Sequence, residues 1–323
     1  MLVSNSLLKV VDMCERQYYY KGVKQLVLNR TAVQLKRGGW LHELLEAYYM
    51  HGYWAFRHDE LVKDYNKLDD EQKDYYGNLP EDCSSIMERY VYHWRKIDQG
   101  LKIIAVEKVF EIPWPHGHKF QGKFDVIVED EYGRWLMEHK SHAKLPDDDY
   151  RFMDIQTARY VYALNKVGTY GEITGVMWNY LVTALPKKPQ MTKGGRLSRR
   201  KIRTDALTFL KAIREYGLDP RDFKDDIIRL KSRSDDYFRR VPVPIQKEVV
   251  TRLVKEGVLA ADRIEELERG KTPIRNIGRH CTWCDYQDIC IIDLYGGNSK
   301  PLIKAKYHTE KPLSYHGTTE EAS

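Results

Sequence analysis

The spacing of apolar residues predicts helices in the first part of the chain. Residues 4–20, 34–56 and 86–99 carry apolar side chains at three- and four-residue intervals, as an amphipathic helix does. The spacing predicts that Cys14 faces inward from the first of these helices. We therefore predict a helical region over residues 1–100.

The period changes after residue 101 to one that is typical of strands. Three runs, at 103–112, 119–128 and 134–141, are bounded by Pro, Gly or acidic turn residues. They predict three strands. A symmetric hairpin turn at 130–133 would join the second strand to the third.

The following pattern predicts a small mixed sheet. Residues 154–166 return to helical spacing, and residues 171–185 read as another strand. Residues 234–245 predict a further strand and residues 246–269 a helix rich in charge pairs four residues apart. A strand, a helix and a strand in succession favour a mixed α/β fold.

These elements predict one domain followed by a tail. The chain has 323 residues, 42% of them hydrophobic, which is enough for a full core. The domain would span residues 1–296, with the core at 101–245 and a C-terminal helix and cysteine segment at 246–296. Residues 297–323 are polar and predict a flexible tail.

Composition argues against a membrane protein. No stretch approaches the roughly 18 uncharged apolar residues that a membrane helix needs, and the start MLVSNSLLKVVDM lacks the features of a signal peptide. We expect a cytoplasmic protein with no membrane partner. The net charge of +6 is modest, but an uneven distribution would favour a polyanion.

The cysteines predict a metal site. Five cannot all pair, and a reducing compartment disfavours disulfides. Cys281, Cys284 and Cys290 lie within ten residues, and Cys14 would be a distant fourth ligand, which fits one four-thiolate site for zinc or an iron–sulfur cluster. Zinc is the less favoured, because a zinc ribbon would supply two local cysteine pairs. Ordinary buried cysteines are the alternative, and Cys83 is left over.

Asp125, Glu138 and Lys140 predict a second metal site. The symmetric turn would set Asp125 opposite Glu138, about 5 Å apart at Cβ, where two like charges are destabilising unless a cation lies between them. Lys140 projects from the same strand face as Glu138. Carboxylates suit Mg²⁺ or Mn²⁺, which activate water for phosphodiester hydrolysis. The alternative is a solvated hairpin with an exposed ion pair, and a one-residue slip would separate the acids.

The order of four short motifs resembles a known family. The chain carries a histidine on an upstream helix, then G-x-x-D, then E-x-K, then Q-x-x-x-Y on a downstream helix. They occur at His42, at Gly122 and Asp125, at Glu138 and Lys140, and at Gln156 and Tyr160. This order resembles the RecB-like branch of the PD-(D/E)xK nuclease superfamily. The resemblance implies a restriction-endonuclease-like α/β fold, a mixed sheet flanked by helices.

The resemblance also implies roles. The metal ligands would be His42, Asp125, Glu138 and the backbone carbonyl of His139; the residue serving the nucleophilic water would be Lys140; the residues positioning DNA would be Gln156 and Tyr160. Without the resemblance, His42 reads as a core histidine, and the pair Gln156 and Tyr160 as packing and surface residues.

The one-plus-three cysteine pattern is similar to that of the iron–sulfur subset of this family. That subset includes the AddB nuclease domain and the CRISPR-associated adaptation exonucleases. The similarity implies a structural 4Fe–4S cluster in the C-terminal segment.

A basic loop predicts contact with DNA. The stretch 187–203 contains no acid, and its basic residues are Lys187, Lys188, Lys193, Arg196, Arg199, Arg200, Lys201 and Arg203. Such a loop can follow a phosphate backbone, although a bare charge run is more often solvated. Phe238, Arg239 and Arg240 would extend this surface or blunt a strand edge.

Together these features predict a metal-dependent DNA exonuclease acting on single-stranded ends in recombination, replication or processing. No G-x-x-x-x-G-K-[ST] loop occurs, so unwinding would need a helicase or recombination partner. The rival interpretations are an endonuclease, a non-catalytic iron–sulfur DNA-binding protein and an electron carrier. The pattern predicts no oligomeric state.

Overall fold

A five-stranded sheet forms the centre of the computed structural model, which describes residues 1–147, 154–194, 197–198, 203–233 and 236–311. The strand order is β3-β6-β7-β8-β9. Only β7 and β8 run parallel, and the other neighbours are antiparallel. The strands are β3 (Lys102–Val106), β6 (Val126–Asp130), β7 (Gly133–His142), β8 (Gly175–Val182) and β9 (Phe238–Pro244). The predicted mixed α/β fold is confirmed.

Two of the predicted strands break at acidic residues. The runs 103–112 and 119–128 each divide between the central sheet and a second sheet of order β1-β5-β4. The chain turns at Glu107, whose φ is 50°, and at Asp125, whose carbonyl accepts a hydrogen bond from the Glu107 N–H at 2.7 Å. The second sheet contains β1 (Leu2–Ser4), β4 (Val109–Pro113) and β5 (Lys119–Lys123). The prediction of three strands is therefore wrong, since the segment forms five.

The hairpin register is confirmed. Val126 lies opposite Met137, and Asp130 lies opposite Gly133. Asp125 immediately precedes this pairing, so it reaches the level of Glu138 as the symmetric turn requires. The turn thus places the two acids at one end of β6 and β7.

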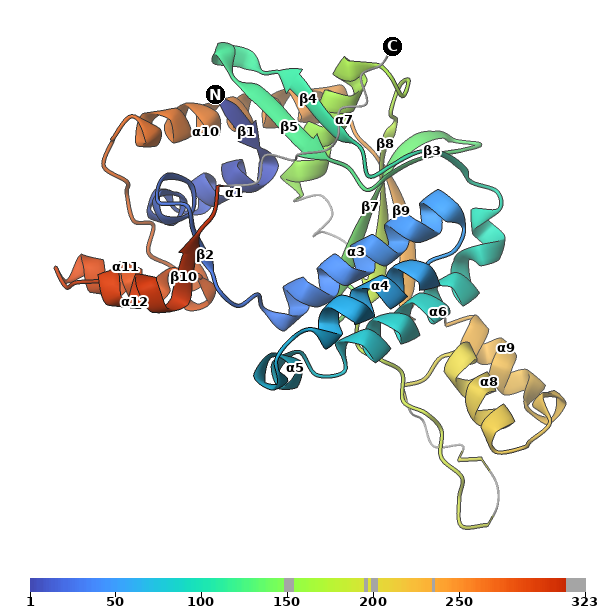
Figure 1. Cartoon of the computed structure of the whole chain (residues 1–323). Helices are drawn as coiled ribbons and strands as arrows, with labels where there is room; N and C mark the ends of the chain where they lie inside the picture. Colours follow the sequence, from blue (N-terminus) through green and yellow to red (C-terminus); the bar gives the residue numbers. More distant parts are fainter. Residues whose placement is uncertain (148–153, 195–196, 199–202, 234–235, 312–323) are drawn as a thin grey trace.

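Helices cover both faces of the central sheet (Figure 1). One face packs against α3 (Val33–His51), α4 (Ala55–Asn66) and α6 (Leu79–Asp98). The other packs against α7 (Ile155–Val167), which α10 (Lys247–Glu268) covers, and α10 in turn packs against α1 (Asn5–Met13). Side chains alternate between the layers, so Val126 and Met137 face α3 and α6, whereas Ile127 and Leu136 face α7. This alternation gives neighbouring residues of β7 different surroundings.

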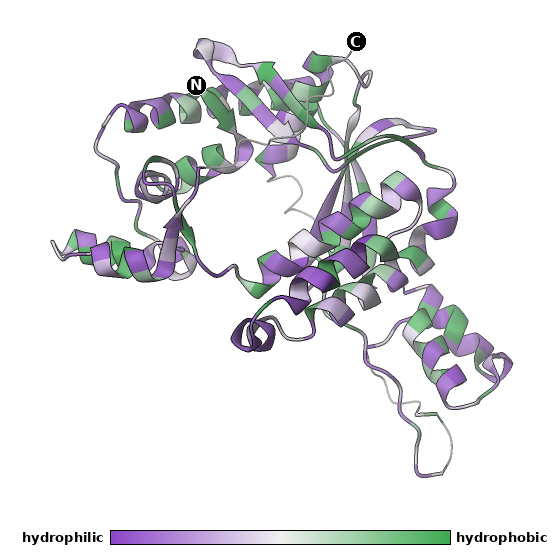
Figure 2. Ribbon diagram, in the orientation of Figure 1, coloured by the Kyte–Doolittle hydropathy of each residue, from purple (hydrophilic) through white to green (hydrophobic). Residues whose placement is uncertain are grey.

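Helix α5 (Asp70–Tyr76) is stabilised by capping rather than by burial. Figure 2 shows it hydrophilic, and it has no buried residue. The Gln72 N–H donates to the Asp69 carboxylate at 2.7 Å, and the Asp69 N–H donates to the Gln72 side chain at 3.3 Å. This capping box satisfies two N–H groups that the helix start would otherwise leave unpaired.

Helices α8 (Ala206–Glu215) and α9 (Lys224–Lys231) form an outlying pair. They have a small core of their own around Phe209, Ile213 and Leu230. The sequence pattern made no prediction for this segment. In Figure 1 the pair lies beyond α6, next to the extended arm that follows β8.

The two ends of the chain meet in a satellite core. Its elements are α2 (Glu15–Tyr18), the π-helix Tyr19–Val23, β2 (Leu26–Leu28), α11 (Gln287–Leu294), α12 (Lys300–Lys306) and β10 (Tyr307–Thr309). Strand β10 pairs antiparallel with β2, and the Tyr307 ring stacks on Tyr286. The prediction of a flexible tail is therefore wrong for residues 300–309, because buried Tyr307 fixes the strand. Residues 312–323 lie outside the described chain.

No helix in the described ranges combines the length and the apolar character needed to cross a membrane.

Gly122 of the G-x-x-D motif has a packing role. A Cβ at this position would lie 2.5 Å from Phe110 Cζ and 2.8 Å from Tyr160 Cζ. We expect Gly122→Ala to lower the free energy of unfolding by about 2 kcal/mol, because overpacking forces both rings to move. Gly39→Ala is the matched control, since nothing lies within 4 Å of its Cβ, and it should raise stability slightly. Urea denaturation of the two variants tests this, and equal effects would contradict it.

Candidate active site

Asp125 and Glu138 are both buried at the end of the β6–β7 hairpin. Their exposed fractions are 8% and 4%. The His139 backbone N–H donates to Asp125 Oδ2 at 2.7 Å, and His42 Nδ1 of α3 lies 3.2 Å from Asp125 Oδ1. Two different elements thus hold the Asp125 carboxylate in one orientation.

A group of three residues surrounds this carboxylate with potential metal ligands. Each of three residues, His42, Glu107 and Asp125, offers one potential ligand atom, and these three atoms lie within 4.8 Å of one another. Glu107 comes from the bend between β3 and β4, and its carboxylate lies 2.6 Å from Lys123 Nζ. The motif comparison missed Glu107. The signal that could have found it is an acid within the apolar run IIAVEKVF, where burial of a charge is costly without a purpose.

Glu138 lies close to this group but is not a member of it. Its Oε1 accepts hydrogen bonds from Lys140 Nζ at 2.8 Å and from Gln156 Nε2 at 3.4 Å. Its Oε2 is buried and has no hydrogen-bond partner among the described residues. One carboxylate oxygen is therefore held, and the other is left without compensation for its burial.

Burial and neighbouring charges shift the protonation of these groups. Burial raises the pKa of Glu138 to about 7. The Lys140 ammonium opposes this increase, and the negative charge of Asp125 adds to it. Burial raises the pKa of Glu107 to about 7, with Asp125 adding to the effect. Burial alone would lower the pKa of His42, but the Asp125 carboxylate raises it to about 9. A cation bound at this site would therefore compete with protons for these groups.

Gln156 and Tyr160 of α7 have separate surroundings. Gln156 contacts Glu138, as described above. Tyr160 is only 3% exposed, and its ring packs on Phe110 at a centroid distance of 5.1 Å. The two residues of the predicted pair therefore lie in different places, because Gln156 contacts Glu138 whereas the Tyr160 ring belongs to the core.

Comparison with known proteins decides the family. The sequence profile of the PD-(D/E)XK nuclease superfamily matches residues 2–291. This chain belongs to that superfamily. Membership makes it a hydrolytic nuclease with DNA as substrate, in a family that uses divalent metals such as Mg²⁺ or Mn²⁺.

Solved structures are more distant. A protein from Eubacterium rectale, named only as a candidate exonuclease, shares 15% identity at a TM-score of 0.46, with 91% of this chain and 93% of that chain covered. The protein SSO0001 shares 12% identity at a TM-score of 0.28, covering 72% and 79%. No curated protein sequence matches the nuclease.

Behind β7 of the nuclease lies a buried polar network. His139 faces α3 and α6, where Tyr49 stacks on its ring and Asn179 Nδ2 lies 2.7 Å from its Nδ1. Asn179 Nδ2 also donates to Tyr90 Oη at 2.7 Å. The Arg240 side chain joins Tyr49, Tyr90 and Asn179. The network thus supports the strand that carries Glu138 and Lys140 from its other face.

The prediction that Phe238 and Arg240 extend a DNA-binding surface is wrong. Phe238 is buried, and the Arg240 side chain is 6% exposed. Arg240 pairs with Asp98 and stacks on Trp94, with 4.0 Å between its Cζ and the ring centroid. A charge on β9 is tolerated inside because a carboxylate and two phenols surround it.

The four cysteines of the predicted cluster line one cavity of about 360 Å³ between α2 and α11. Cys14 lies where α1 ends in extended backbone, and the Asn276 N–H lies 3.5 Å from its sulfur. Cys281 lies in the 3-10 helix Arg279–Trp283, Cys284 directly follows it, and Cys290 lies in α11. Cys83 is buried elsewhere, in the layer of α3 and α6. The four cysteines of the predicted cluster thus share one cavity, and Cys83 lies apart from them.

The described part of the basic loop forms an extended arm. The Lys187 N–H donates to the Arg203 carbonyl at 2.7 Å, and Met191 bridges Leu197. Lys188 pairs with Glu215, and Lys193 is exposed. Its members outside the described residues are Arg196, Arg199, Arg200 and Lys201. The arm's contacts are with the region of α8 and β9, not with the carboxylates.

Proposed function

We propose that this nuclease is a metal-dependent DNA exonuclease that hydrolyses single strands from their ends, in recombination, replication or processing. The observation that carries the proposal is the convergence of His42, Glu107 and Asp125 beside a Glu138 held by Lys140. In a solvated hairpin, water would hydrate each charged side chain separately, so these side chains would not need to converge. The lack of a phosphate loop in the sequence supports a separate helicase or recombination partner.

The donor set fits Mg²⁺ or Mn²⁺. His42, Asp125 and Glu138 would hold the ion with the His139 carbonyl, and Glu107 is an additional candidate ligand. Oxygen ligands suit these ions, and the unpartnered Glu138 Oε2 is available for one. When bound, the ion would lower the pKa of a water and offset charge on the scissile phosphate.

The chain's own residues supply orientation and charge. Lys140 Nζ, held by Glu138 and 5.8 Å from the Trp178 ring centroid, would hold the attacking water or the phosphate oxygens. Gln156 would orient Glu138 through its amide. Asn179 and Tyr49 would fix the His139 ring and with it the backbone between the two catalytic side chains.

Stabilisation by metal should increase with pH. The folded-state pKa values of Glu107, Glu138 and His42 are raised, so these groups contribute stability at low pH. For the carboxyls that contribution is lost as pH rises through about 7, and for His42 through about 9. Because a cation competes with these protons, Mn²⁺ should raise the Tm more at about pH 8.5 than at about pH 6. Thermal melts with Mn²⁺ or EDTA measure this. In the Asp125→Asn variant, Mn²⁺ should raise the Tm little at either pH. Equal Tm increases at both pH values in the wild-type protein would contradict the assignment of these residues to a metal site.

We further propose that the four cysteines hold a 4Fe–4S cluster. The four cysteines line one cavity, as a single four-thiolate site requires. The sequence lacks the two local cysteine pairs of a zinc ribbon, which favours the cluster over zinc. Its thiolates would join the N-terminal and C-terminal segments.

Linear and covalently closed single-stranded DNA test the mode of cleavage. With Mg²⁺ or Mn²⁺, the linear strand should be degraded to short products and the circle should survive, because an exonuclease needs an end. Purification under anaerobic conditions protects an iron–sulfur cluster. Cleavage of the circle at a comparable rate would identify an endonuclease instead.

A further inference from the structure

A groove follows the outer face of α6, on the side of the molecule away from Glu138 and Lys140. Two cavities of about 780 and 590 Å³ meet at Trp54, Val91 and Arg95. None of the proposed catalytic residues lines either cavity. We call this joined surface the α6 groove.

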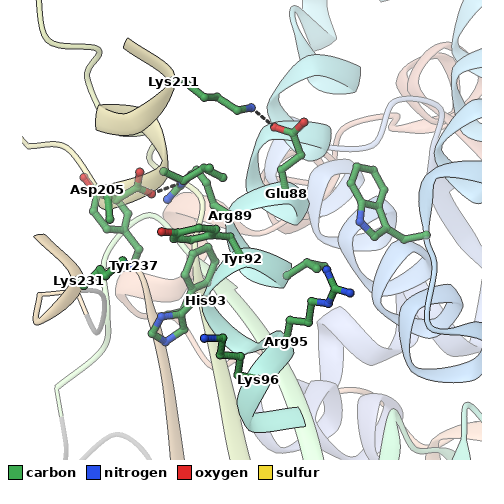
Figure 3. A pocket seen from close by; sticks show the side chains of 15 residues that line it. Glu88, Arg89, Tyr92, His93, Arg95, Lys96, Asp205, Lys211, Lys231 and Tyr237 are labelled. Atoms are coloured by element: carbon green, nitrogen blue, oxygen red, sulfur yellow. Dashed lines mark hydrogen bonds and ion pairs between the residues drawn. The ribbon is translucent and has the colours of Figure 1, made fainter. Parts of the chain in front are cut away.

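The larger cavity of the α6 groove is basic. Its charged lining comprises five basic residues, Arg89, Arg95, Lys96, Lys211 and Lys231, and two acidic residues, Glu88 and Asp205. Both acids are already paired, Glu88 with Lys211 and Asp205 with Arg89 (Figure 3). Arg95 and Lys96 have no ion-pair partner in the described part of the chain. Two cations on adjacent positions of α6 thus remain available to a ligand.

Exposed aromatic rings line the same surface. Tyr92 in the larger cavity is 42% exposed, and Tyr53 in the smaller one is 59% exposed. Trp54 lines both cavities. Exposed rings among unpaired cations are typical of surfaces that bind single-stranded nucleic acid, where bases stack and phosphates meet the charges.

The α6 groove continues toward the basic arm. Tyr237 lines the larger cavity and also a neighbouring one of about 390 Å³, to which Arg203, Arg229 and Arg233 contribute. The Arg203 guanidinium lies 5.1 Å from the centre of the Tyr237 ring. The base of the arm therefore adjoins one end of the α6 groove, which gives the predicted basic loop a surface to act with.

We propose that the α6 groove binds a single-stranded segment of the DNA substrate outside the active site, with bases on Tyr92 and Tyr53 and phosphates on Arg95 and Lys96. This inference rests on the proposed nuclease function for the identity of its ligand. Lys140 lies over Trp178 on the α7 side of the sheet, whereas α6 packs against Phe238 on the α3 side, and His42 of α3 lines neither cavity of the groove. The groove would hold a long substrate while another part of it is cleaved.

Binding of a labelled oligonucleotide of about 30 residues, measured by anisotropy in EDTA, tests the groove. We expect the double variant Arg95→Ala, Lys96→Ala to weaken binding severalfold and to lower the salt slope by about 0.7 for each lost phosphate contact. Arg252→Ala with Lys255→Ala is the matched control, because it removes the same charge from exposed positions of α10. Tyr92→Ala should weaken binding roughly tenfold, and Tyr92→Phe should not.

The outcomes separate this inference from the proposed function. If the protein cleaves DNA but the two double variants bind alike, the groove inference is overturned and the nuclease remains; a protein partner would then be the better occupant. If binding depends on Arg95 and Lys96 in a protein that cleaves nothing, the groove is supported and the nuclease proposal fails. Thermal melts confirm that each variant is folded.

Discussion

Replacing Asp125 with Asn should reduce DNA cleavage on the order of a thousandfold, because several kcal/mol of metal-dependent stabilisation would be lost. The amide can still accept the hydrogen bond from the His139 N–H, so the hairpin should keep its shape. The negative charge that pairs with His42 and attracts a cation would be gone. Single-turnover cleavage of a linear strand with Mn²⁺ measures the loss.

Asp130→Asn is the matched control for this change. Asp130 lies at the other end of β6, where its Oδ1 accepts from the Tyr132 N–H and from Trp135 Nε1, both at 2.9 Å. The same charge is removed from the same strand, yet cleavage should stay near the wild-type rate. An Asp125→Asn protein that is folded and cleaves within about tenfold of wild type would remove Asp125 from the proposed metal site.

Replacing Cys284 with Ser should release iron and lower the Tm by roughly 5–10 °C, because metal ligation contributes directly to folding free energy. The change should loosen the ends of the chain before the central sheet, since the cavity lies between α2 and α11. Iron and sulfide analysis of anaerobically purified protein, with limited proteolysis near residues 271–278, measures both effects. Release of the ends should be partial, because β2 still pairs with β10.

Cys83→Ala is the control for the cluster, since Cys83 is buried in the other layer of the protein. The Cys83→Ala variant should be somewhat less stable, because the smaller side chain leaves a cavity in the core, but it should still bind iron. If the wild-type protein contains one equivalent of zinc and no iron, the cysteines form a zinc site and not an iron–sulfur cluster. If the wild-type protein contains no metal and the Cys284→Ser change leaves its stability unaltered, the cysteines are not metal ligands.

The hairpin at Asp125 and Glu138 could be predicted because its information is local. A symmetric four-residue turn fixes which residues face each other, and the structure has this register. The alternation of side chains then separates Glu138 and Lys140 from His139. The helical spacing of α7 was equally local, with Asp154 capping its start.

The break at Glu107 could not be predicted in the same way. The run IIAVEKVFEI is compatible with one long strand, and only the pairing of its two halves with different sheets ends the first strand. Glu107 therefore acquires its place near Asp125 from tertiary structure. Arg240 is a similar case, since a basic residue on a strand reads as exposed until its partners Asp98, Tyr49 and Tyr90 are known.

The pairing of β2 with β10 has a consequence for the order of folding. Leu28 meets Tyr307 across some 280 residues of chain, so this contact has one of the longest loops to close. A ribosome makes β2 near the beginning and β10 only after the strands of the central sheet. The satellite core around Tyr286 and Tyr307 is thus completed after the sheet has been synthesised. In the proposed cluster, Cys14 would meet its three partner cysteines only at that stage. Delivery of a cluster to the new protein would accordingly be a late step, made on a chain that already contains its nuclease core.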